Sequence, residues 1–111
     1  KAVQTLAGNT DSRFGSWFEA LDYMYEQVFC EEFDIAIIGC GAYGFPLAAK
    51  VKKTGKSAIH LGGATQLFFG IRGKRWEQHP VISNLFNEYW TNPLPEDVPD
   101  NCNRVEKGCY W

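Results

Sequence analysis

Two glycine-rich turns hold the residue types best suited to binding a ligand. Residues 39–44 read Gly-Cys-Gly-Ala-Tyr-Gly and satisfy the pattern G-x-G-x-x-G, and residues 62–65 read Gly-Gly-Ala-Thr. Glycines allow the backbone to approach a ligand closely, and the free amides at the start of a helix attract phosphate. The two turns therefore predict a cradle for a phosphate or a diphosphate.

Further polar residues accompany the turns. We expect the phosphate or ribose of the ligand to contact Gly39, Gly41, Tyr43 and Gly44. The second face of the site is expected to consist of Gly62, Gly63, Thr65 and Gln66. The charge of the diphosphate is expected to be neutralised by Arg72 and Arg75. His60 is the one titratable group near the turns suited to proton transfer, which makes it the candidate catalytic residue. The alternative is structural: the glycines only permit tight packing, and the histidine is a packing residue.

The elements before the first turn follow from periodicity. A short strand is expected over Ala2–Leu6. Ser16 and Glu19 form a capping box, and apolar residues at three- and four-residue spacing predict an amphipathic helix over 17–31. The β-branched run Phe33–Ile38 predicts a strand buried on both faces.

The first glycine turn directly follows that strand and opens a helix. The helix continues over Leu47–Lys53 and stops at Gly55, and Ser57–Leu61 forms the next strand. Such a β-α-β unit should be parallel and right-handed. We therefore predict one Rossmann-like α/β domain over residues 1–111, with a short parallel sheet between two helical layers.

The C-terminal part is expected to be less regular. Gln66–Ile71 predicts one or two helical turns, and Pro80 starts a predicted helix whose apolar positions reach Trp90. Prolines make the tail irregular from about residue 91. The closing Cys109, Tyr110 and Trp111 should dock on the body because of their apolar area.

Composition and charge narrow the function. The 111 residues suit one domain, 45% of them are hydrophobic, and no apolar run approaches the ~20 residues of a membrane span. The net charge is −2, yet residues 35–76 contain no Asp or Glu. All charges in that stretch are basic, at Lys50, Lys52, Lys53, Lys56, Arg72, Lys74 and Arg75. A local basic block argues against general nucleic-acid binding and for a small anionic ligand.

Cysteine usage argues against a metal site. The four cysteines show no C-x-x-C spacing, and without a visible export signal we expect reduced thiols and a cytoplasmic protein. Cys40 lies inside the first glycine turn, where the start of a helix could lower the pKa of its thiol. The favoured interpretation is that Cys40 is a small residue that only fills space in the turn. Because the chain opens on Lys1 without methionine, we expect its natural N-terminal portion to lie upstream.

A dinucleotide cofactor is the first alternative. The acidic residue expected after the second strand to bind the ribose is absent, because His60, Leu61 and Gly62 occupy that position. The stretch 35–76 also lacks carboxylates for acid–base or metal chemistry. An NAD(P)- or flavin-dependent oxidoreductase fragment is therefore the less favoured interpretation.

The strings IGCGAYGFPLAAK, IHLGGATQLFFGIRGKRW, NEYW and GCYW resemble the C-terminal half of a family of bacterial proteins similar in layout to GT-D-type glycosyltransferases. The likeness runs from about Trp17 to Trp111. It implies a cytoplasmic Rossmann-like domain that uses a sugar nucleotide, often in polysaccharide biosynthesis. The acidic metal and donor motif of that type is not in this chain, which contains no D-x-D or D-x-E string.

We therefore expect sugar-nucleotide binding in a glycosyltransferase-like protein with no metal ligands in this segment. Expected partners are the nucleotide-sugar, the N-terminal portion of the same protein and a possible second copy, with no nucleic acid and no membrane span. The third interpretation is a non-catalytic interaction domain, which many exposed aromatic residues would favour.

Overall fold

The computed structural model describes residues 3, 5 and 11–111, and these fall into two compact units. Within the described residues, unit 1 contains residue 3 and residues 11–65, and unit 2 contains residue 5 and residues 66–111. The strand expected over Ala2–Leu6 lies mostly outside the described residues. A single domain over the whole chain stays a prediction.

Unit 1 begins with helix α1 (Trp17–Phe29), which confirms the predicted amphipathic helix. The Ser16 hydroxyl accepts a hydrogen bond from the Glu19 amide at 3.2 Å, and the Glu19 carboxylate accepts one from the Gly15 amide at 2.7 Å. These two bonds satisfy amides that have no partner inside the helix. Ala20 and Leu21 are buried and attach the helix to the core.

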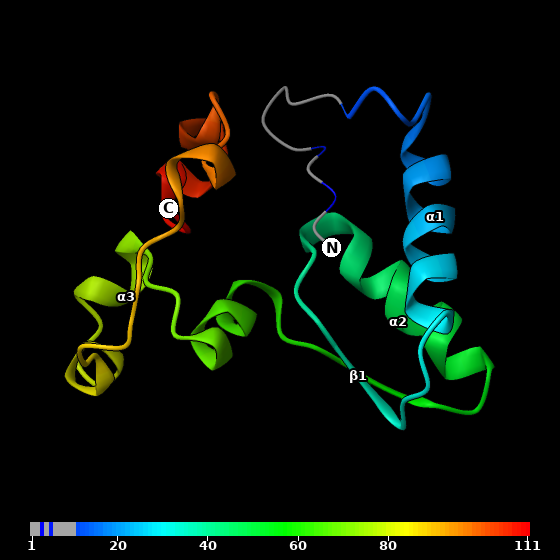
Figure 1. Cartoon of the computed structure of the whole chain (residues 1–111), viewed down its shortest axis with the longest axis horizontal. Helices are drawn as coiled ribbons and strands as arrows, with labels where there is room; N and C mark the ends of the chain where they lie inside the picture. Colours follow the sequence, from blue (N-terminus) through cyan, green and yellow to red (C-terminus); the bar gives the residue numbers. More distant parts are fainter. Residues whose placement is uncertain (1–2, 4, 6–10) are drawn as a thin grey trace. The chain divides into compact units, whose positions relative to one another are not determined.

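The β-α-β unit follows as strand β1 (Ile35–Ile38), helix α2 (Gly44–Lys53) and strand β2 (Ser57–His60). The two strands are parallel, with Ile38 opposite His60 at their carboxyl ends. Helix α2 packs against both strands and against α1 (Figure 1). The core cluster consists of Ala20, Leu21, Ile38, Tyr43 and Leu47.

Helix α2 ends as the sequence predicts. Thr54 caps its C-terminus, and Gly55 follows with φ +85°. This left-handed conformation suits glycine because the residue has no Cβ.

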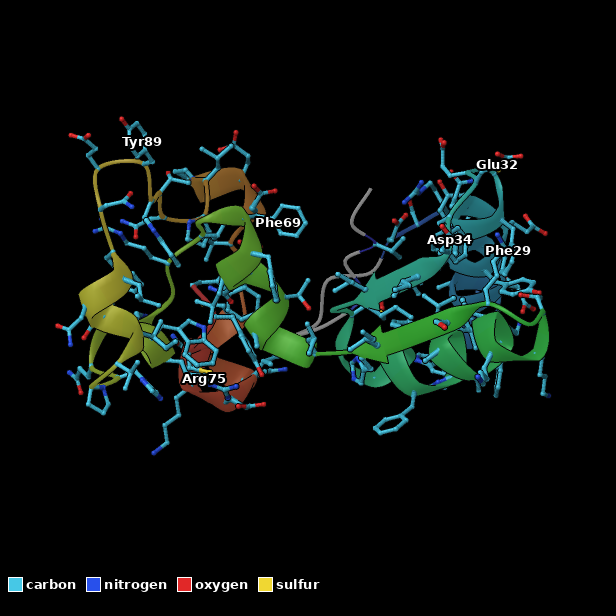
Figure 2. The ribbon with its side chains drawn as sticks, turned by 90° about the horizontal axis from the view of Figure 1, so that it is seen from below. Phe29, Glu32, Asp34, Phe69, Arg75 and Tyr89 are labelled. Atoms are coloured by element: carbon cyan, nitrogen blue, oxygen red, sulfur yellow. The ribbon has the colours of Figure 1, made fainter. Side chains whose placement is uncertain are left out.

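The predicted burial of β1 on both faces is wrong. Ile35 and Ile37 are each 55% exposed and Ile59 on β2 is 47% exposed. Among the described residues of unit 1, both helices lie on the other side of the strands, and Figure 2 shows the strands in front of them. The chain thus has a mixed α/β fold with a two-stranded parallel sheet, as predicted, while the second helical layer stays a prediction.

Unit 2 consists of short helical turns. The 3-10 helix η2 (Gly62–Phe69) runs across the boundary between the units, and α3 (Lys74–Glu77) is a single turn that the sequence did not predict. Ile71 and Thr91 form an isolated parallel bridge.

The predicted helix from Pro80 to Trp90 is wrong, because only the 3-10 turn η3 (Ile82–Leu85) forms there. The His79 ring accepts hydrogen bonds from the amides of Val81 and Ile82, each at 3.2 Å. The Asn87 side chain accepts another from the Tyr89 amide at 3.0 Å. Side chains that bond to nearby amides compete with helical hydrogen bonds, which explains the failure.

The tail contains three more 3-10 turns, η4 (Pro95–Asp97), η5 (Cys102–Arg104) and η6 (Glu106–Gly108). Its end docks within unit 2, as expected, since the Arg75 amide donates to the Cys109 carbonyl at 2.9 Å. Among residues 3, 5 and 11–111, the structure contains no helix with the length and hydropathy of a transmembrane span.

Candidate functional site

The first glycine turn leaves β1 and enters α2 through the 3-10 turn η1 (Gly41–Tyr43). Gly41 has φ +51°, a conformation that disfavours most side chains. The Tyr43 amide donates to the Cys40 carbonyl and the Gly44 amide to that of Gly41. Among the described residues, the amides of Gly39 and Cys40 donate to no backbone carbonyl.

The two glycine turns lie against each other at the carboxyl ends of the strands. A Cβ on Gly39 would stand 2.9 Å from the Gly62 carbonyl oxygen and would also overlap the Thr65 side chain. The contact is close enough that only glycine fits at position 39. The structure therefore brings together Gly39, Gly62 and Thr65.

The Ile38 carbonyl oxygen joins these turns. It accepts the Leu61 amide at 3.0 Å and the Thr65 hydroxyl at 3.4 Å, and the His60 Nδ1 atom lies 3.2 Å away. Ile38 is the last residue of β1, so this junction fixes the end of one strand against the end of the other.

His60 occupies the space above Gly44. A Cβ on Gly44 would stand 2.6 Å from His60 Nε2 and would overlap the rest of that ring edge. The Phe45 ring meets the imidazole edge-on, with 5.3 Å between ring centroids. Two of the glycines, Gly39 and Gly44, thus serve close packing, which is the structural alternative stated for them.

Tyr43 lies in the core rather than on an open surface. Its ring is buried and stacks on Trp17, with centroids 4.9 Å apart and planes 8° from parallel. From this position its side chain contributes to the packing of α1 against the first turn.

Gln66, Arg72 and Arg75 belong to unit 2 and are engaged there. The Gln66 amide donates to the Ile71 carbonyl at 3.2 Å. Arg72 donates to the Asn87 carbonyl at 3.2 Å, and Arg75 forms an ion pair with Glu106. Their part in a diphosphate site stays a prediction.

Two lysines of the basic stretch also have interaction partners within unit 1. Lys50 forms an ion pair with Asp22. The Lys56 ammonium donates to the Phe33 carbonyl at 2.5 Å and lies 4.5 Å from the centre of the Phe33 ring. These two lysines therefore already have partners. Lys50 stabilises the surface of α2 and Lys56 the start of β2 through local contacts.

Cys40 does not have the environment of a nucleophile. Burial raises the pKa of its thiol, which favours the unreactive protonated form. All four cysteines are free thiols. Over the described ranges, no three His, Cys, Asp or Glu side chains come together in a group that could hold a metal ion.

One hollow lies at the opposite end of the sheet and was not expected from the sequence. It is open and is lined by Glu32, Phe33, Asp34 and Lys56, where the Ser57 amide donates to the Asp34 carbonyl. The run of acidic residues just before β1 was the available sequence signal. Because Lys56 is already bonded to Phe33, we assign this hollow no ligand.

Neither a family model nor a curated protein nor a solved structure matches this chain, so the resemblance to GT-D-type glycosyltransferases stays a prediction.

Proposed function

We propose that unit 1 binds the phosphate groups of a nucleotide at the two glycine turns, in a glycosyltransferase-like protein that uses a sugar nucleotide. One observation carries the proposal: two glycine turns follow neighbouring parallel strands and contact each other through Gly39, Gly62 and Thr65. Ligands of open parallel sheets collect outside the carboxyl ends of the strands. Gly39 and Cys40 supply amides without carbonyl partners among the described residues at that place.

The finer parts of the proposal extend this site. Gly41, Gly62 and Gly63 supply further backbone amides, whereas the Gly44 amide already donates to the Gly41 carbonyl. The sheet would gain a second helical layer and become Rossmann-like. Four free thiols are typical of reducing compartments, so we place the protein in the cytoplasm.

A thermal-shift screen tests the ligand class. A ligand that binds only the folded state raises the melting temperature, by an amount set by its concentration relative to Kd. We expect UDP-, GDP- or dTDP-sugars to raise it and NAD or NADP to leave it unchanged. A shift with NAD or NADP alone would favour the oxidoreductase fragment, and no shift with any of them would contradict nucleotide binding.

A second function, docking to another protein, is favoured by a different observation. Ile35, Ile37 and Ile59 expose a continuous apolar sheet face, and parallel sheets are normally covered on both faces. Exposed aromatic side chains also occur, at Trp17, Phe18, Phe45, Phe68, Phe69 and Tyr89. The melting temperature of an interaction domain would not change when a nucleotide is added. A partner protein that binds stably to this face would cover these isoleucines and remove them from solvent.

A further inference from the structure

His60 has a polar contact that favours one protonation pattern. Its Nδ1 atom lies 3.2 Å from the Ile38 carbonyl oxygen. A carbonyl oxygen can only accept, so a hydrogen bond here requires a proton on Nδ1. In the neutral ring, Nε2 is then unprotonated and can itself accept a hydrogen bond.

The surroundings hold the ring in this orientation. The Cε1 atom, which lies between the two ring nitrogens, is nearest to Gly44, the first residue of α2, and the Phe45 ring borders the imidazole. Because no side chain at position 44 could share this space, the ring has a defined place beside the first glycine turn. The half-buried His60 side chain thus adjoins the turn proposed to bind phosphate.

The second histidine of the chain has the opposite pattern. His79 Nδ1 accepts hydrogen bonds from the backbone amides of Val81 and Ile82, so it carries no proton. Neutral His79 is therefore protonated on Nε2. The protein holds only these two histidines, so each serves as the internal reference for the other.

We propose that His60 is a specificity-determining residue: it is held as the Nδ1–H tautomer by Ile38, and its Nε2 accepts a hydrogen bond from a ribose hydroxyl of the bound nucleotide. The hydroxyl contact rests on the proposed function, whereas the tautomer does not. A ligand that lacks this hydroxyl leaves the acceptor unpaired in a partly buried place, which weakens its binding.

The tautomer is tested by ¹⁵N NMR of the two histidine rings above pH 8, with signals assigned through His60→Asn and His79→Asn. Protonated and unprotonated ring nitrogens differ clearly in chemical shift. We expect Nδ1–H for His60 and Nε2–H for His79. The Nε2–H form at His60 would overturn the proposal whether or not any nucleotide binds.

The hydroxyl contact is tested by titrating UDP, 2′-deoxy-UDP and 3′-deoxy-UDP. The wild-type protein should bind one deoxy analogue about threefold to tenfold more weakly than UDP. His60→Asn retains an N–H that can donate to Ile38 but lacks Nε2, so it should bind all three alike, whereas His79→Asn should discriminate like the wild type.

Equal binding of all three by the wild type would overturn the hydroxyl contact and leave the proposed function standing. Discrimination that persists in His60→Asn would also overturn it. If no UDP-, GDP- or dTDP-sugar binds the wild-type protein, the proposed function and the contact both fail, and the NMR result still decides the tautomer.

Discussion

Gly44 and His60 restrict each other, because the imidazole fills the space that a side chain at position 44 would need. Gly44→Ala should lower the free energy of unfolding by about 1–3 kcal/mol, the usual cost of overpacking. In a His60→Ala background the same substitution should cost much less, since the ring is gone. Chemical denaturation of the four proteins of this double-mutant cycle measures the difference.

Gly62→Ala is the matched control for that cycle. Gly62 has φ +57°, and apart from its two chain neighbours no heavy atom of the described residues lies within 4 Å of the place that a Cβ would take, so its cost comes from the backbone alone. This cost should be the same with and without the His60 ring. Equal costs of Gly44→Ala in both backgrounds would contradict the packing described for this pair.

The ion pair of Asp11 and Arg13 predicts a dependence of stability on pH. Hydrogen bonds from the Arg13 guanidinium lower the pKa of Asp11 to about 2. A carboxylate whose pKa is lowered in the folded state stabilises above its unfolded value of about 3.9, and this contribution is lost as the pH falls toward 2. Asp11→Asn should therefore be less stable than the wild type at pH 6 and equal to it near pH 2.

Denaturation at several pH values checks this expectation. The difference should be small, because the pair is partly exposed to solvent and is screened by salt. A gap between the two proteins that stays constant from pH 6 to pH 2 would contradict the assigned ion pair.

At the scale of elements, helix α2 carries its stabilising contacts on one face. Leu47 is 4% exposed and belongs to the core, whereas Phe45 on the same helix is 78% exposed. Leu47→Ala should cost about 2–5 kcal/mol of unfolding free energy, because it removes buried methyl groups and leaves a cavity. Phe45→Ala should cost less than about 1 kcal/mol. Urea denaturation of both variants compares them, and similar costs would contradict the packing of α2.

The elements differ in how far the sequence could predict them. The helix that begins at Ser16 was predictable because its capping residues and its apolar spacing agree with each other. The segment after Pro80 has an apolar spacing that suits a helix. Its backbone amides nevertheless donate to the side chains of His79 and Asn87 instead of to helical carbonyls. The open face of β1 could not be predicted, since a run of β-branched residues does not reveal how many helices cover it.

The candidate site was predictable only in outline. That the two glycine turns meet follows from parallel strands with adjacent carboxyl ends. The burial of Tyr43 and the filling of the space at Gly44 by His60 depend on tertiary packing between α1, α2 and β2. The division of the chain into two units, with Arg72 and Arg75 in unit 2, likewise has no local sequence signal.

At the scale of the whole molecule, the central claim is that unit 1 binds phosphate at the turn between β1 and α2. Gly41→Asp places a negative charge there, at a φ of +51° that aspartate tolerates better than most residues. Gly55→Asp adds the same charge at another left-handed glycine, beyond the far end of α2. The two variants thus match in charge and in the sign of φ and differ in position.

The most direct measurement is isothermal titration of the wild-type protein and both variants with the UDP-, GDP- or dTDP-sugar that gives the largest thermal shift. The account predicts that Gly41→Asp abolishes binding while the variant stays folded, and that Gly55→Asp binds like the wild type. Unchanged affinity in Gly41→Asp, or no binding by the wild-type protein, would contradict the account.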